Sequence, residues 1–290
     1  FNSIAIDNNG NTFLCGESTS PAFPTMSAGT YYDGTIGSGN DIIIAKFSAA
    51  GTFLWGTFFG GFAASGDDED GTGIKTDAAG NVFVTGITNA PNFPVQSGGG
   101  YYNALLNGTG SGNSKDGFLA KFSNNGALIF STFIGGASDD IPHDVTIDNN
   151  GNVFVSGETY SPNFPTQNGG GYYDATNNGD DGFIMKFSNS GALNWSTFFG
   201  GASQDIIYSA SCDNSGNIFI VGSTNDGSKD CYVGKFSGAN GNAIWQKRYD
   251  VDGLDDTGTG VTIDKDGNLA VVGTTQFMGN FIPVFKINGG

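Results

Sequence analysis

One phrase recurs five times along this chain of 290 residues and constrains its fold more than any other feature. Each copy holds an Asp with Gly-Asn at the third and fourth positions after it (D-x-x-G-N), followed by an apolar run such as VFVSG. Recurrence at a long, regular period is typical of tandem units that bury their cores against their neighbours. The aspartates that mark the copies are Asp7, Asp77, Asp148, Asp213 and Asp264, at spacings of 70, 71, 65 and 51 residues.

Two further phrases follow the first in most copies. One places a lysine before a phenylalanine, as in DGFLAKF from Asp116, and the other reads like FLWGTFFGG from Phe53. All three alternate at period two and are rich in Val, Ile, Phe and Thr, which predicts half-buried β-strands joined by tight Asn-Gly and Ser-Gly turns. The chain is therefore predicted to be all-β, a β-propeller of five four-stranded antiparallel blades.

The blades are expected to form a single domain over residues 1–290, and the last blade is expected to be incomplete. The chain ends on the phrase PVFKINGG, a third strand, so the fifth blade lacks its outer strand. Residues Phe1–Ser3 together with upstream residues would supply it, or the ring closes without it, or the chain is part of a larger propeller. The predicted blade boundaries are 1–61, 62–136, 137–201, 202–253 and 254–290.

These phrases resemble a known family. The patterns D-x-x-G-N-x-F-V-x-G-x-T, S-P-x-F-P, D-x-F-x-x-K-F and W-x-T-F-x-G-G are similar to the bacterial SBBP repeat, and the resemblance covers essentially the whole chain. It implies a propeller of a secreted, periplasmic or outer-surface protein, and it implies no single activity. The chain departs from the family in the fourth and fifth blades, which lack S-P-x-F-P.

The charge balance narrows the range of partners. Lys and Arg total 11 against 28 Asp and Glu, for a net charge of −17. This excess repels phosphate backbones and anionic lipids, so nucleic acid is not expected as a partner. No apolar run is long enough to span a bilayer, so direct membrane insertion is not expected either.

The three cysteines, Cys15, Cys212 and Cys231, cannot form a complete set of disulfides. Cys212 and Cys231 fall on the first and third strands of one blade, too far apart to bridge. All three are expected to be free and buried.

Long loops between the second and third strands of the first three blades carry repeated aromatic residues. Exposed Phe and Tyr make good contact surfaces for protein or sugar. The alternative is that these rings turn inward and fix each loop to its own blade. The candidate partner-binding residues are Phe23, Tyr31, Tyr32, Phe93, Tyr101, Tyr102, Phe164, Tyr172 and Tyr173.

An acidic residue precedes the repeat Asp by eight positions in four copies, at Glu69, Asp140, Asp205 and Asp256. Oxygen ligands from several loops suit a hard cation, so these residues are the candidate metal site, with Ca²⁺ as the ion. The alternative is that each carboxylate caps its own turn through backbone N–H groups. No other cofactor is expected.

The lysine of the third strand repeats as well, at Lys46, Lys121, Lys186, Lys235 and Lys286. First and third strands end at the same face, so each ammonium group is predicted to form a structural ion pair with its blade's Asp7-type carboxylate.

Signals for catalysis are sparse. The chain has one histidine, His143, and one arginine, Arg248, without a nucleophile elbow or zinc-ligand spacing. The sequence thus favours a non-enzymatic protein-interaction scaffold whose partner is an envelope or surface protein, with an accessory role in a secretion or surface-adhesion and motility machine as a variant. The alternative is a carbohydrate-binding propeller, or one that cleaves glycans with acidic residues.

Overall fold

The computed structural model describes residues 1–29, 31–37, 39–62, 68–107, 114–225, 227–250, 253–264 and 266–275, together with the backbone of 284–287. All the regular elements in this part of the chain are strands, and they follow the repeated phrases. The first sheet contains β1 (Ser3–Ile6), β2 (Thr12–Ser18), β3 (Asp41–Phe47) and β4 (Phe53–Phe59), and the second contains β5 (Asp70–Thr76), β6 (Val82–Thr88), β7 (Asp116–Phe122) and β8 (Leu128–Ile134).

The remaining sheets repeat this plan. The third contains β9 (Asp140–Ile147), β10 (Val153–Thr159), β11 (Asp181–Phe187) and β12 (Leu193–Phe199). The fourth contains β13 (Ile206–Cys212), β14 (Ile218–Asn225), β15 (Lys229–Phe236) and β16 (Ala243–Tyr249). The fifth has three strands within the described residues, β17 (Asp256–Ile263), β18 (Leu269–Thr275) and β19 (Val284–Ile287).

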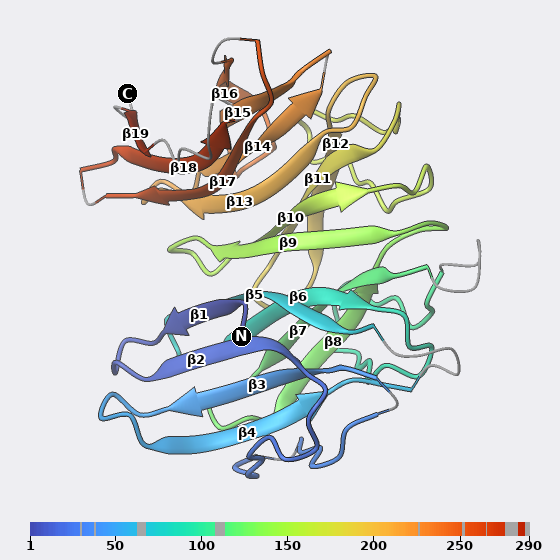
Figure 1. The fold of residues 1–290 in the computed structure, drawn as a ribbon, viewed down its shortest axis with the longest axis vertical. Coiled ribbons are helices and arrows are strands. Elements are labelled where there is room, and N and C mark those ends of the chain that lie inside the picture. The colour runs from blue at the N-terminus through green and yellow to red at the C-terminus, as the bar shows by residue number, and fades with distance from the viewer. Residues whose placement is uncertain are drawn as a thin grey trace. The chain divides into compact units, whose positions relative to one another are not determined.

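Each strand pairs antiparallel with the next one along the chain, so every sheet is an up-and-down meander (Figure 1). This is the blade topology predicted from the repeats, and the fold class is confirmed as all-β, built from antiparallel four-stranded sheets. The fifth sheet has three strands within the described residues, and the incomplete last blade stays a prediction.

The D-x-x-G-N phrase forms the turn between the first and second strands of each sheet. In the first sheet, Asp7 Oδ1 accepts the backbone N–H groups of Asn9 and Asn11 at 2.9 Å, and its Oδ2 accepts the Asn11 side chain at 2.8 Å. Gly10 has a φ of 77°, a left-handed conformation that glycine adopts without strain. The Asp, Gly and Asn of the phrase are therefore all required by one turn.

Contact density divides the chain into two compact units. Unit 1 contains Phe1–Val145, Asn163–Pro165 and Asn189–Ala192, and unit 2 contains Thr146–Pro162, Thr166–Ser188 and Leu193–Gly290. Within unit 1, β1 and β2 lie against β5, and within unit 2, β13 and β14 lie against β17. The single domain and its blade boundaries remain a prediction.

The third-strand lysines lie close to the predicted carboxylates. Lys121 Nζ is 3.6 Å from Asp77 Oδ2, and Lys235 Nζ is 3.3 Å from Asp213 Oδ2, so the predicted ion pair is confirmed in these two sheets. Lys46 Nζ also donates to the backbone oxygen of Asn124 at 3.1 Å, in the turn after β7.

The lysine stems pack as the sequence predicts. Lys46, Lys121, Lys186 and Lys235 each place Nζ over a phenylalanine ring of the adjacent strand, at 4.8 to 5.6 Å from the ring centroid. A cation at this distance from an aromatic face is attracted by it. The side chain of Lys286 lies outside the described residues.

The three cysteines are free, as predicted. Cys15 and Cys231 are buried, and burial raises the pKa of each thiol to about 12, so neither is a reactive thiolate. The expectation of burial is wrong for Cys212, which is partly exposed. Among the described residues, no helix is long and apolar enough to cross a membrane.

Candidate functional site

The aromatic residues of the long loops divide into buried and exposed groups. Phe93 and Phe164 are buried, with exposed fractions of 2% and 4%, so they belong to the protein core and cannot contact a partner in this structure. Phe23 is partly buried and packs on Phe1 and Phe58. The exposed candidates are Tyr32, Tyr102, Tyr172 and Tyr173. A partner-binding role for these tyrosines remains a prediction.

The tyrosine that begins each Tyr-Tyr pair turns toward the core in unit 1. Tyr31 is half-buried and packs edge-on against Phe59 and Phe122, at centroid distances of 5.5 and 5.8 Å. Tyr101 is also half-buried, and burial raises its pKa to about 12. These contacts support the alternative in which the rings fix the loops in place.

Three of the four candidate metal ligands accept hydrogen bonds within their own turns. Glu69 accepts the backbone N–H of Gly61 at 3.0 Å, Asp140 accepts that of Gly136 at 2.7 Å, and Asp205 accepts that of Gly201 at 2.7 Å. These bonds correspond to the turn-capping alternative. Asp256, like these three, is buried. Among the described residues, no group of three or more His, Cys, Asp or Glu side chains is placed to hold a metal ion, and the Ca²⁺ site remains a prediction.

Two of these carboxylates lie beside a second carboxylate at the start of the third strand. A Cβ atom at Gly135 would meet Asp116 Oδ1 and Asp140 Oδ2, both at 2.8 Å. A Cβ at Gly200 would likewise meet Asp205 Oδ2 at 2.5 Å and Asp181 Oδ1 at 2.7 Å. Glycine is therefore required at the end of the W-x-T-F-x-G-G phrase because two carboxyl groups converge there.

The pKa values of Asp116 and Asp181 reflect this crowding. Burial, together with the charges of Asp140 and Asp139, raises the pKa of Asp116 to about 7. Burial raises the pKa of Asp181 to about 6, with a smaller contribution from Asp205. Near neutral pH these pairs therefore retain protons that isolated carboxyl groups would lose.

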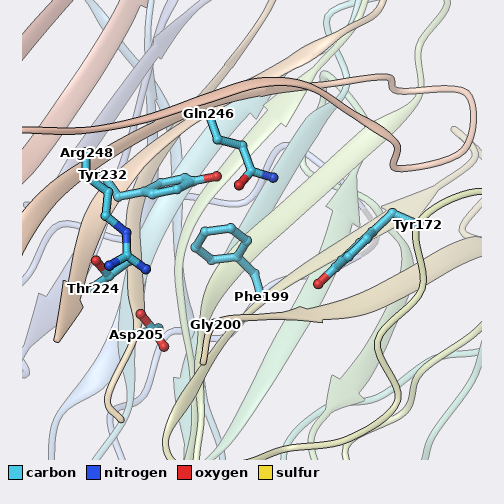
Figure 2. A pocket seen from close by; sticks show the side chains of 8 residues that line it. All are labelled: Tyr172, Phe199, Gly200, Asp205, Thr224, Tyr232, Gln246 and Arg248. Atoms are coloured by element: carbon cyan, nitrogen blue, oxygen red, sulfur yellow. The ribbon is translucent and has the colours of Figure 1, made fainter. Parts of the chain in front are cut away.

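A pocket opens beside the second of these pairs, entirely within unit 2. Its volume is about 130 Å³. Aromatic walls come from Tyr172, in the loop before β11, from Phe199 at the end of β12, and from Tyr232 on β15. Figure 2 shows these rings around the same space, with Arg248, Thr224 and Asp205 gathered on the side away from Tyr172. The lining residues are Tyr172, Phe199, Gly200, Asp205, Thr224, Tyr232, Gln246 and Arg248.

Two hydroxyl groups in this lining have no hydrogen-bond partner among the described residues. They are Thr224 Oγ1 and Tyr232 Oη, on side chains that are 2% and 4% exposed. A buried hydroxyl without a partner typically destabilises a fold by about 1–3 kcal/mol, and among the described residues Ser156 Oγ and Thr275 Oγ1 lack one too, away from this pocket. The position of Thr224 Oγ1 and Tyr232 Oη in the wall of a pocket indicates that a polar ligand can bond to them.

The sequence predicts only part of this site. The sequence indicates Tyr172 as a partner-binding residue and Asp205 as a metal ligand. It does not predict Thr224, Tyr232 or Arg248 as site residues. The available signal is a break in the repeat: the phrase from Ala243 reads AIWQKRYD, where the others read like LNWSTFFG. Two polar side chains, Gln246 and Arg248, replace small or apolar ones there.

Known proteins resemble this chain in its repeat and in its fold. Residues 129–165 match the SBBP β-propeller repeat. The resemblance of the sequence to this family, and the propeller fold that it implies, are thereby confirmed. No curated protein matches the chain in sequence.

Solved structures resemble it in fold. A protein of unknown function from Dyadobacter fermentans DSM 18053 has a TM-score of 0.58 at 10% identity, covering 99% of this chain and 78% of that one. The gluconolactonase XC5397 from Xanthomonas campestris has a TM-score of 0.43 at 14% identity, covering 97% and 71%. A luciferin-regenerating enzyme has a TM-score of 0.44 at 11% identity, covering 99% and 90%.

These structures correct one prediction. The sequence predicts that the chain is not an enzyme, on the ground that it lacks catalytic motifs. That prediction is wrong, because proteins similar to it in fold include a gluconolactonase and a luciferin-regenerating enzyme. At such low identity these structures show the fold alone, and no particular reaction follows from them.

Proposed function

We propose that the chain is a carbohydrate-binding β-propeller and that the pocket of unit 2 is its binding site. The observation that carries this proposal is the pair of unpartnered buried hydroxyls, Thr224 Oγ1 and Tyr232 Oη, in a pocket with aromatic walls. Specific ligand pockets combine apolar walls with a few placed polar groups. A sugar ring matches both, because its C–H faces are apolar and its edge carries hydroxyls.

The aromatic walls suit the faces of such a ring. Phe199 and Tyr232 have ring centroids 4.5 Å apart and form one continuous wall. Tyr172 is 40% exposed, and in Figure 2 it stands on the far side of Phe199 from Arg248. A rigid aromatic side chain at the mouth of a pocket provides contact area with little loss of conformational entropy.

The polar side chains of the pocket suit the hydroxyl-bearing edge of a sugar ring. Arg248 and the Gln246 amide donate hydrogen bonds, Asp205 accepts them, and the Thr224 and Tyr232 hydroxyls do both. Neighbouring hydroxyls of a sugar require this mixture of donors and acceptors, whereas a purely apolar ligand would leave Thr224 and Tyr232 unpaired. A location outside the cytoplasm, as the SBBP resemblance implies, would bring the site to surface glycans.

A glycan array followed by calorimetry tests the proposal. Tyr232→Phe removes one hydroxyl and keeps the ring, so we expect the affinity for a bound glycan to fall about tenfold, the equivalent of one hydrogen bond. Tyr172→Ala removes an aromatic wall and is expected to weaken binding at least as much.

The matched control is Tyr173→Ala, which removes the adjacent exposed tyrosine outside the pocket and should leave the affinity unchanged. The proposal is overturned if no glycan binds, or if glycans bind with the same affinity to Tyr232→Phe and Tyr172→Ala. A different outcome would support protein interaction instead: the chain binds no glycan but captures an envelope protein, and Tyr102→Ala and Tyr173→Ala abolish that capture.

A further inference from the structure

A phenylalanine of a long loop fills the equivalent position in unit 1. The ring of Phe93, from the A-P-N-F-P segment between β6 and β7, lies 4.7 Å from Phe59, 4.9 Å from Phe118 and 5.8 Å from Phe133, measured between centroids. It is 2% exposed. One six-membered ring therefore occupies this place completely.

The residues that hold Phe93 have counterparts in the pocket of unit 2. Phe59 and Phe199 occupy the same position in the third repeated phrase, and Phe118 corresponds to Tyr232 in the second. Phe118 pairs with Phe133 across β7 and β8, and Tyr232 pairs with Arg248 across β15 and β16. Three contacts of Phe93 thus become three walls of the pocket.

The rest of the lining follows the same correspondence. Tyr172, Gly200, Asp205 and Thr224 match Tyr31, Gly60, Glu69 and Thr88 of unit 1, and Gln246 matches Ser131. The fourth sheet lacks the loop that would fill the space, because only residues 226–228 connect β14 to β15. The pocket is therefore the position of Phe93 with the phenylalanine absent and with a more polar lining.

We propose that a single, uncharged, terminal sugar ring of a glycan enters this position as a substitute for the missing phenylalanine ring. This inference rests on the proposed carbohydrate function and names the part of the glycan that is bound. The volume of about 130 Å³ is close to that of cavities that hold one benzene ring, which are about 150 Å³.

The inner wall of the pocket is closed, which is why the ring must be a chain end. Gly200 lines the pocket, and a Cβ added to it would touch both Asp205 and Asp181. Asp181 itself is 2% exposed, so side chains of the described residues fill the space behind Gly200. An internal sugar, with a glycosidic bond on each side, needs two openings, whereas a terminal ring needs only one.

The charges around the pocket favour a neutral ring. Asp205 lines it, and Asp181 lies behind it with Asp174 and Asp180 near enough to raise its pKa. Arg248 is the single arginine of the chain. Arg248 and Asp205 together offer a donor and an acceptor to adjacent hydroxyls, whereas a sugar carboxylate would also meet the carboxyl group of Asp205.

The first test uses the full chain on arrayed glycans in sets that share an internal sequence and differ in their terminal residue. We expect binding to follow the terminal residue, and we expect the free monosaccharide of that residue to compete. The uronic acid of the same sugar should compete at least tenfold less well. Binding that follows the internal sequence, and that still falls with Tyr232→Phe, would overturn the terminal-ring inference while leaving carbohydrate binding in place.

The second test restores the lining of unit 1. The double variant Gln246→Ser, Arg248→Phe copies Ser131 and Phe133, and we expect it to weaken binding at least tenfold with an unchanged circular dichroism spectrum. Lys247→Thr copies Thr132 on the same strand but lies outside the pocket lining, and it should bind as the parent does.

Should the double variant fail to fold, Thr224→Val removes only a hydroxyl and is expected to weaken binding by about tenfold. Unchanged affinity in a folded variant of either kind would overturn the inference. The absence of any glycan binding in the parent chain would instead overturn the proposed function itself.

Discussion

Asp116 and Asp77 are buried carboxyl groups of the second sheet whose surroundings act on them in opposite directions. Burial raises the pKa of Asp116, and the nearby Asp140 and Asp139 raise it further. Burial alone would also raise the pKa of Asp77, but side-chain hydrogen bonds from Asn81 and Asn189 outweigh it and lower the pKa. The two groups therefore give the fold opposite dependences on pH.

Asp116→Asn tests the first of these effects. An acid with a folded-state pKa near 7 and an unfolded value near 4 binds more protons when folded, so its contribution to stability falls as pH rises between those values. Asn copies the protonated form and has no such dependence. We expect the free energy of unfolding of the variant, relative to the parent, to increase by up to about 1.4 kcal/mol per pH unit between pH 4 and 7, measured by urea denaturation.

Asp77→Asn is the matched control, with the opposite sign. The lowered pKa of Asp77 stabilises the fold above the unfolded value, and this stabilisation is lost as pH falls through the folded value. At pH 7 we expect the variant to lose about 1–3 kcal/mol, because hydrogen bonds and an ion pair to a charged group are removed. Parallel pH profiles for the two variants would contradict this assignment.

At the scale of elements, the repeated phrases predict the strands well because each strand depends on local alternation and each turn on a few residues. The phrase DGFLAKF, for example, is β7 from end to end. The lysine contacts were also predictable, because the first and third strands of a blade end at the same face, where the lysine can reach the repeat Asp.

The candidate site was less accessible to prediction. Whether Phe93 points outward or inward depends on Phe59 and Phe133, which lie on other strands, so the loop sequence alone leaves both orientations open. The pocket exists because the fourth sheet lacks the long loop between its second and third strands. An absent loop leaves no residues in the sequence that could indicate the space it would have filled. Only the comparison of equivalent positions in folded sheets shows that Tyr232 and Arg248 line an empty space.

The turn between β3 and β4 offers a test of backbone strain at this scale. Gly51 has a φ of 81°, and a Cβ added there would meet no atom within 4 Å. Gly51→Ala therefore adds conformational strain without a collision, and we expect it to lower the free energy of unfolding by about 1–2 kcal/mol. Gly51→Asn should lower it less, because Asn tolerates this conformation better. Equal losses in the two variants would contradict the explanation.

For the whole molecule, the charge imbalance is the dominant electrostatic feature. The 28 acidic residues exceed the 11 basic ones, and several carboxyl groups are buried close to others. Net charge of this size destabilises the compact state through self-repulsion, and the repulsion is weakened by salt.

We accordingly expect the melting temperature to rise as NaCl increases from about 0.01 to about 0.15 M, which shortens the Debye length from about 30 to about 8 Å. Calorimetric scans at pH 7 measure it, with glycerol at matched osmolality as the uncharged control. A melting temperature that falls with salt would mean that ion pairs such as Lys121–Asp77 contribute more than the overall repulsion.

The position of Phe93 has a consequence for how proteins of this kind diversify. The ring comes from a loop, and the sheets on either side of it keep the same strand pairing whether the loop is present, as between β6 and β7, or short, as between β14 and β15. One deletion between the second and third strands of a blade would thus expose a binding site, and one insertion would close it, without refolding the scaffold. On the proposed carbohydrate function, each blade that lacks the loop and has a polar lining would add one site, and avidity for branched glycans would grow with the number of such blades.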